Sequence, residues 1–199
     1  MLKSPNILLL FFVLASLGMV SQTQTKSFKV IHKNKACGML TIARSENKGV
    51  VEYYSKTSIN ANVLFKDIQV DYEYRVYYHN NVFNRSNVGV YINGKLHSKS
   101  ITVKKADGYE LSKDEKEPFF IVNPIKYSSI RLYFSEPSDA FPTYSEQHGT
   151  FDQIVPVSKG VYQKIDNKNR TNTYHYEEGV LKRADIDGGL VKFQLISHG

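Results

Sequence analysis

The sequence predicts an all-β fold, a long-stranded antiparallel meander of about ten strands that curls into an open or incomplete barrel with little helix. Three observations predict it. Apolar and polar residues alternate over residues 67–78, one hairpin signature occurs twice, and no window shows the spacing of a convincing amphipathic helix. Tyr accounts for 14 of the 199 residues and Trp for none, a composition that favours sheet faces.

The first residues are expected to be removed before the domain folds. Lys3 gives a positive start and Ile7–Leu17 is an uncharged apolar run, as in a secretory signal peptide. The run is shorter than the roughly 20 residues that a membrane span needs, and no second run follows it. We therefore expect a cleaved signal peptide over residues 1–21 and a single β domain over residues 22–199. This mature chain would have no transmembrane span and would be soluble, either periplasmic or secreted.

The strand over residues 67–78 is the clearest element. One face carries Ile, Val and Tyr side chains, the other carries Asp, Gln, Glu and Arg, and only Tyr77 breaks the alternation. At ~3.3 Å per residue this strand spans roughly 40 Å, about twice the length of an ordinary strand. Long strands of this kind belong to sheets that curl.

Further strands follow at lower contrast, separated by turns that contain Gly, Asn or Asp. They are expected at Ser27–Lys33, Met39–Ser45, Val50–Ile59, Val88–Ile92, Leu96–Lys104, Tyr109–Leu111, Phe151–Val157, Val161–Ile165, Asn172–Tyr176, Leu181–Asp185 and Leu190–Ile196. Cys37, the only cysteine, is expected in a turn between the first two of them, and a single cysteine forms no internal disulfide. One or two helical turns are expected within Tyr127–Phe134.

Two segments share the pattern Tyr-x-(Asn/Glu)-Gly-x-Leu, Tyr91–Leu96 and Tyr176–Leu181. Gly accepts the positive φ that a tight hairpin turn requires, so both segments indicate antiparallel hairpins. A ribbon of consecutive hairpins with one apolar face and no helices to cover it must roll up to bury that face. This is why we expect a curled sheet.

The formal net charge is +7, and it falls to +6 when Lys3 is removed with the signal peptide. The basic residues are spread out, and no basic block is longer than a pair. A nucleic-acid-binding protein would show a basic stripe or a motif with base-stacking aromatic residues. We therefore expect no nucleic-acid partner.

The chain lacks the sequence signatures of common hydrolases, metalloproteases and phosphate-binding loops. Its six histidines have no metal-ligand spacing, so no metal and no cofactor is expected. The nearest candidates for a catalytic set are Glu136, Glu146 and His148, in which the two glutamates could act as acid and base. The alternative, which we favour, is that these glutamates accept backbone N–H groups at a corner of the fold or pair with Arg44 or Arg131.

The tyrosines indicate a second candidate site. Tyr combines a flat apolar ring with a hydroxyl, which suits a lipid or another amphipathic ligand. The candidate lining residues are Tyr72, Tyr74, Tyr78, Tyr91 and Tyr133. The alternative, which small barrels favour, is that these rings simply fill the core.

The order of these features resembles a family of secreted proteins from Bacteroidota-type bacteria that is described only as a domain of unknown function. The resemblance covers nearly the whole mature chain and rests on CGMLTIAR (37–44), the Tyr-rich strand, YINGKL (91–96), LYFSEP (132–137), YSEQHGTF (144–151) and YHYEEGVL (174–181). It implies a fold and a location and no particular activity. More distantly, the architecture is similar to the half-barrels of periplasmic lipoprotein carriers, which hold acyl chains against a concave apolar sheet.

Three hypotheses about function follow. The favoured one is an exported, non-catalytic, barrel-like module that binds an apolar or amphipathic ligand of the cell envelope. The second is a structural or protein-interaction domain whose partner is an envelope protein. The third is a hydrolase that uses Glu136 and Glu146.

Overall fold

The computed structural model describes residues 22–63, 66–188 and 192–198. The signal peptide expected over residues 1–21 lies outside them, as does the start of the strand expected over Leu190–Ile196. Within the described residues, fourteen strands form one antiparallel sheet, which confirms the all-β prediction. No helix in this part of the chain is long and apolar enough to cross a bilayer.

The chain forms the sheet in two runs. The first run is β1 (Gln22–His32), β2 (Lys35–Asn47), β3 (Val50–Val63), β4 (Lys66–His79), β5 (Val82–Ile92), β6 (Lys95–Lys104), β7 (Tyr109–Lys113) and β8 (Phe119–Ile121). A short 3-10 helix, η1 (Ser129–Tyr133), connects the two runs. The second run is β9 (Phe141–Ser145), β10 (Thr150–Ser158), β11 (Val161–Ile165), β12 (Thr171–Glu177), β13 (Val180–Asp187) and β14 (Lys192–Ser197).

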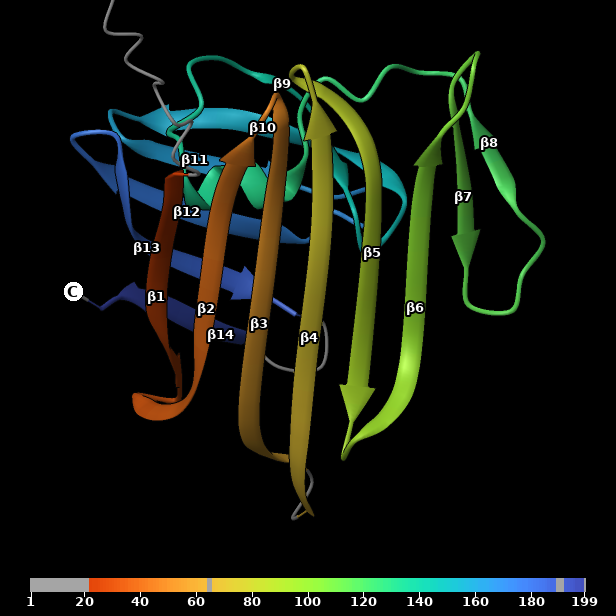
Figure 1. Ribbon diagram of the computed structural model, residues 1–199. Helices are drawn as coiled ribbons and strands as arrows, with labels where there is room; N and C mark the ends of the chain where they lie inside the picture. The colour runs from red at the N-terminus through yellow and green to blue at the C-terminus, as the bar shows by residue number, and fades with distance from the viewer. Residues whose placement is uncertain (1–21, 64–65, 189–191, 199) are drawn as a thin grey trace, which may run out of the picture.

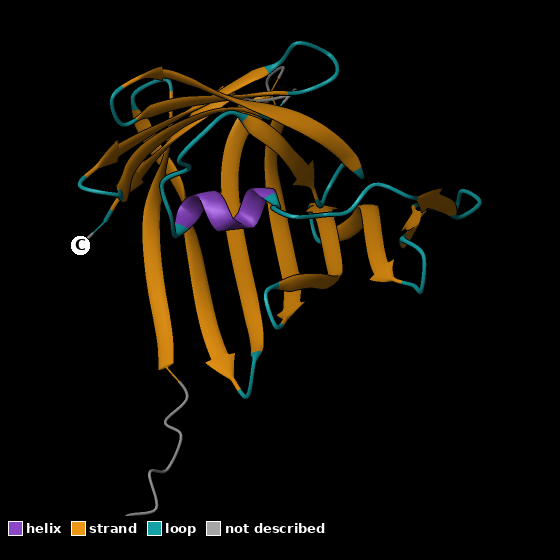
Figure 2. Ribbon diagram, turned by 90° about the horizontal axis from the view of Figure 1, so that it is seen from above, coloured by secondary structure: helices purple, strands orange, loops and turns teal. Residues whose placement is uncertain are grey.

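The two runs join where β14 pairs with β1, so the order across the sheet is β8 to β1 followed by β14 to β9. The end strands β8 and β9 are not neighbours in this order, and the sheet therefore stays open, as predicted. Figure 1 shows the long strands β1–β6 side by side, with the strands of the second run crossing behind them. In Figure 2 the same curl appears from above, with η1 enclosed between the two layers.

The alternation over residues 67–78 is confirmed in β4. Its apolar positions face the core and its polar positions face solvent, so that Val70, Val76 and Tyr78 are buried and Asp67, Gln69 and Arg75 are exposed. The neighbouring strand β3 continues the inner face, because directly paired residues of antiparallel strands point to the same side.

The helix η1 closes the concave side of the sheet. Ile130 and Leu132 are 3% and 0% exposed, and both belong to one core cluster that contains residues of both runs. The hydroxyl of Tyr176 donates to the carbonyl oxygen of Leu132 at 2.6 Å, and Lys26 Nζ donates to that of Tyr133 at 3.0 Å. The helical turns predicted within Tyr127–Phe134 are thus confirmed, and they cover part of the apolar inner face of the sheet.

Both predicted hairpins are confirmed. Asn93 and Gly94 have φ of 50° and 75°, and Glu178 and Gly179 have the same two values, so each turn has two successive left-handed residues. This geometry matches the right-handed twist of the flanking strands.

The prediction of a turn around Cys37 was wrong. The turn falls at Lys33 and Asn34, which both have positive φ, and Cys37 lies within β2 with its Sγ 3.5 Å from the carbonyl oxygen of Val30. Gly38 has a different reason to be Gly, since a Cβ there would lie 1.9 Å from the carbonyl oxygen of Ser58 on β3. The Gly therefore permits a close approach between strands.

The sequence prediction also missed β8 and β9. β9 carries Pro142, a residue that usually argues against a strand, and it is tolerated there because β9 is the edge of the sheet. The segment between Glu136 and Glu146, for which we predicted no strand, therefore contains one.

Candidate functional site

A cavity of about 150 Å³ lies between the two runs of the sheet. Its walls come from β2, β3 and β4 on one side and from β11 to β14 on the other, while η1 and the turn between β9 and β10 close it. It lies under the long strand β4, where the candidate tyrosines were expected.

Small side chains on β3 leave space for the cavity at the wall that β3 and β4 form. Ser55 and Thr57 occupy inner positions of β3, where the neighbouring inner positions hold the larger Tyr53 and Ile59. The two small residues are paired with Tyr74 and Tyr72 of β4, respectively. The wall therefore combines two hydroxyl-bearing small side chains with two aromatic rings.

Three of the five candidate tyrosines line this cavity, namely Tyr72, Tyr74 and Tyr133, and Tyr174 of β12 joins them. The Tyr74 hydroxyl donates to Gln147 Oε1 at 2.8 Å. Burial raises the pKa of Tyr74, Tyr133 and Tyr174, so all three hydroxyls stay protonated at neutral pH and can donate hydrogen bonds.

The other two candidate tyrosines lie elsewhere. Tyr78 is 2% exposed and packs in the core, where its hydroxyl donates to Ser128 Oγ at 2.8 Å. Tyr91 is directly paired with Asp71 on the outer face of the sheet, and its ring covers Gly89. Neither residue lines the cavity, so the structure divides the predicted set into lining, core and outer-face members.

Glu146 is buried in the cavity wall. It lies in the turn between β9 and β10, and it is 1% exposed. Its Oε1 accepts the backbone N–H of Ile130 at 3.0 Å. The first N–H groups of a helix have no partner within the helix, and this carboxyl supplies one for η1. The backbone contact agrees with the corner interpretation, and burial raises the pKa of the Glu146 carboxyl.

Glu136 has a different environment. It is half-buried and accepts a hydrogen bond from the Tyr162 hydroxyl at 3.1 Å, and it does not line the cavity that Glu146 lines. The two arginines expected as partners are engaged elsewhere. Arg44 pairs with Glu46 at 2.6 Å, and the Arg131 guanidinium stacks on Tyr78 and Tyr127. The two glutamates thus have separate partners, and of the two only Glu146 lines the cavity.

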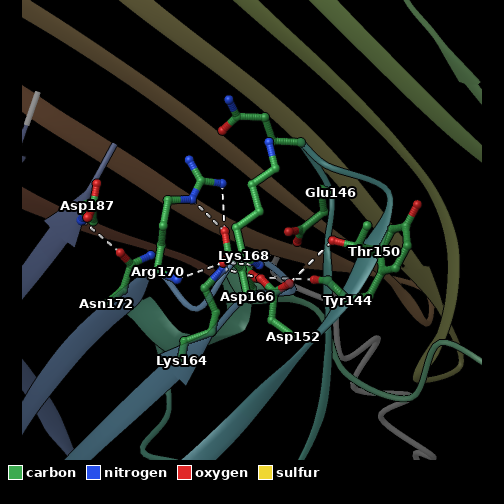
Figure 3. A network of polar contacts seen from close by, with 12 residues as sticks. Tyr144, Glu146, Thr150, Asp152, Lys164, Asp166, Lys168, Arg170, Asn172 and Asp187 are labelled. Atoms are coloured by element: carbon green, nitrogen blue, oxygen red, sulfur yellow. Dashed lines mark hydrogen bonds and ion pairs between the residues drawn. The ribbon is translucent and has the colours of Figure 1, made fainter. Parts of the chain in front are cut away.

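Two ion pairs stand beside Glu146, and the sequence analysis did not single them out. Lys164 Nζ lies 2.8 Å from Asp152 Oδ2, with both side chains almost fully buried. Arg170 pairs with Asp166 through Nε at 2.7 Å and Nη2 at 2.6 Å. Figure 3 shows these pairs next to Glu146; Asp152 and Lys164 lie on the neighbouring strands β10 and β11, whereas Asp166 and Arg170 lie in the loop between β11 and β12. A partial sequence signal was present, because Asp152 and Lys164 alternate with the apolar residues Ile154 of β10 and Tyr162 of β11, which are buried on the same inner face.

His148 follows Glu146 in the same turn and also lines the cavity. Burial, together with the positive charges of Lys113, Lys164 and Arg170, lowers the pKa of His148 to about 4. The imidazole is therefore neutral at pH 7. Among the described residues, no three His, Cys, Asp or Glu side chains gather as a metal site would require.

Comparisons with known proteins place the chain in a family. Neither the curated proteins nor the solved structures gave a match. A family model described as a domain of unknown function, DUF6134, matches residues 28–197, which comprise every strand from β2 to β14 and the last part of β1. The chain therefore belongs to the DUF6134 family.

Proposed function

We propose that this protein is an exported, non-catalytic binding module that takes up one small apolar or amphipathic molecule in the cavity between the two runs of the sheet. The observation that carries the proposal is the cavity itself. An engineered protein cavity of about 150 Å³ holds one benzene molecule, so this one suits a single ring, a lipid headgroup or a short chain. A longer acyl tail would extend outside it.

The lining supports an amphipathic ligand. Leu40, Ile130 and Leu195 are buried apolar lining residues, whereas Arg170 and Asn172 are half-buried and polar. Binding pockets commonly combine an apolar interior with a few polar groups that orient the ligand. An apolar group would lie against the buried side, and a polar group would lie near the half-buried residues.

Export is supported by the sequence. Lys3 and the apolar run Ile7–Leu17 have the order and length of a secretory signal peptide. The ligand would then come from the cell envelope or from outside the cell.

The test fills the cavity. In Ser55→Leu an aliphatic side chain takes the space of the hydroxyl, whereas Ser58→Leu places the same side chain on the outer face of the same strand. Benzyl alcohol, a ring with one hydroxyl, serves as the probe in calorimetric titrations. We expect binding to the wild type and to Ser58→Leu and a loss of at least about tenfold in Ser55→Leu, since the filled cavity excludes the ring.

Organic extraction of protein purified from its native envelope gives a second readout. We expect the wild type to release a small molecule that Ser55→Leu does not retain. Absence of both benzyl alcohol binding and any released molecule would refute the proposal.

A second candidate function is supported by the edge of the sheet. β8 is a terminal strand with an unpaired backbone edge, and around it Phe119, Phe120 and Val122 are 63%, 45% and 72% exposed. Exposed edges with apolar side chains accept an added strand from a partner, here an extended segment of an envelope protein. A photo-crosslinker at position 122 should then give one discrete adduct, and Phe119→Asp should abolish it. A smear of unrelated adducts would contradict this function.

A further inference from the structure

The charged residues of the cavity are paired unequally. Three charged residues that line it have an oppositely charged partner. Lys164 lies 2.8 Å from Asp152, Arg170 lies 2.6 Å from Asp166, and Asp187 lies 3.1 Å from Lys192. Glu146 also lines it. Among the described residues, no Lys, Arg or His nitrogen lies within 4.0 Å of its carboxyl group.

This pairing disfavours an anionic ligand. An anion would have to compete with Asp152 for Lys164 and with Asp166 for Arg170, and both pairs already have short, hydrogen-bonded geometry. Separating a buried pair leaves a carboxylate without its counter-ion, which is strongly unfavourable. A cation meets the opposite situation, because the ionised carboxyl of Glu146 has a backbone N–H as a partner and, among the described residues, no ion pair, although Lys164 acts on it from beyond 4.0 Å.

The remaining walls are also suited to a cation. Tyr72, Tyr74, Tyr133 and Tyr174 place four aromatic rings around the same cavity, with Phe193 as a fifth. The face of an aromatic ring attracts ammonium groups, and sets of such rings bind substituted ammonium ions. The rings and the carboxyl share one electrostatic environment, since burial and then the charge of Glu146 raise the pKa of Tyr74.

Building on the proposed function, we infer that the cavity binds a small organic monocation, a substituted ammonium group, with the Glu146 carboxylate as its counter-ion and the tyrosine rings as its walls. The volume of about 150 Å³ restricts the group to roughly the size of benzene. Such a group is either a free small molecule or the headgroup of an amphipathic one.

The experiment compares choline with 3,3-dimethylbutan-1-ol, which has the same shape and no charge. Calorimetric titrations of the full mature chain use the wild type, Glu146→Gln and Glu136→Gln. We expect choline to bind at least about tenfold more tightly than the neutral alcohol in the wild type and in Glu136→Gln. Glu146→Gln should lose this preference and keep its affinity for the neutral alcohol, because Gln Oε1 can still accept the Ile130 N–H.

Tyr72→Leu tests the aromatic contribution, and it decides the question if Glu146→Gln does not fold. It removes one aromatic wall and no hydrogen bond to η1. It should weaken the binding of choline severalfold more than the binding of the neutral alcohol, because both lose the same apolar contact and only choline loses the cation–π interaction. Circular dichroism confirms that each variant is folded.

The outcomes separate this inference from the proposed function. Equal binding of choline and the neutral alcohol, or no binding of choline, would overturn the cation inference. In both cases, benzyl alcohol binding that Ser55→Leu abolishes would leave the proposed function standing. A choline preference that survives Glu146→Gln would show that another group is the counter-ion, which also overturns the inference.

Discussion

The two runs of the sheet differ in how deeply their most buried ion pair lies, although both also carry exposed pairs. In the first run the ion pairs Lys56–Glu73 and Arg75–Glu52 lie on the outer face, with side chains 31% to 58% exposed. In the second run the pair Asp152–Lys164 lies on the inner face, with side chains 0% and 10% exposed. Burying charged groups costs desolvation energy, so good packing alone does not explain why these two positions carry charged residues.

The two runs also differ in strand length. Strands β1 to β6 have 10 to 14 residues, whereas β9 to β14 have 5 to 9. The long strands give an extended, mostly apolar inner face that small side chains such as Ser55 and Thr57 interrupt. The short strands include β9 and β10, and the turn between them brings Glu146 and His148 to the cavity. The first run thus acts as a scaffold, and the second supplies most of the charged groups of the site.

The largest expected effect breaks the buried ion pair. Asp152→Ala leaves Lys164 buried without a counter-ion, and the free energy of unfolding should fall by about 3–5 kcal/mol. Urea denaturation measures this. Glu73→Ala, which breaks an exposed pair of the first run, should cost no more than about 1 kcal/mol. The double variant Asp152→Ala with Lys164→Met should recover much of the loss, and an equal or larger loss would show that packing, not charge, dominates at this site.

The second-largest expected effect is a pH dependence of stability that arises from His148, in the turn between β9 and β10. His148 has a folded pKa of about 4, below its ordinary value of 6.5, so between these values the unfolded chain binds a proton that the folded chain rejects. The stability that His148 contributes is complete above pH 6.5 and is lost as the pH falls toward 4. This pKa shift corresponds to a contribution of at most about 3 kcal/mol to the free energy of unfolding. The actual contribution is smaller, because the ring is partly exposed and solvent screens its charge.

Urea denaturation between pH 7 and pH 4 checks this dependence. His148→Gln removes the titrating group, so its stability should fall less steeply with acid than that of the wild type. Parallel curves for the two proteins would contradict the proposed environment of His148.

A smaller effect tests how the second run holds η1. Tyr176→Phe removes the hydroxyl that donates to the Leu132 carbonyl oxygen and leaves this buried acceptor without that donor. The free energy of unfolding should fall by about 1–3 kcal/mol. Tyr77→Phe, which removes a hydroxyl bonded to Glu52 on the outer face of the first run, should change it by no more than about 0.5 kcal/mol. Equal losses would remove the distinction between the two faces.

The smallest effect asks whether apolar packing differs between the runs. Ile42 in β2 and Ile154 in β10 are both 0% exposed. Ile→Val at either position should lower the free energy of unfolding by about 0.5–1.5 kcal/mol. Similar values would restrict the difference between the runs to their charges, whereas a much smaller loss at Ile154 would indicate looser packing in the second run.

The sequence by itself determined the elements that depend on local rules. Alternation over residues 67–78 predicted β4, and Asn93-Gly94 and Glu178-Gly179 predicted two hairpin turns, because side-chain direction and backbone φ are properties of a few neighbouring residues. Glu146 was recognisable as a residue that accepts a backbone N–H at a corner, although its donor, Ile130, was not.

The tertiary structure alone decided which residues meet. The pairing of β14 with β1 brings the second run across the first, and this curl selects Tyr72, Tyr74 and Tyr133 for the cavity and places Tyr91 outside. The pairing of the adjacent strands β10 and β11 explains why Asp152 and Lys164 interrupt an apolar face, since it places each charge beside the other. Contacts between residues far apart in the chain depend on how the whole sheet bends, and no local pattern encodes that bend.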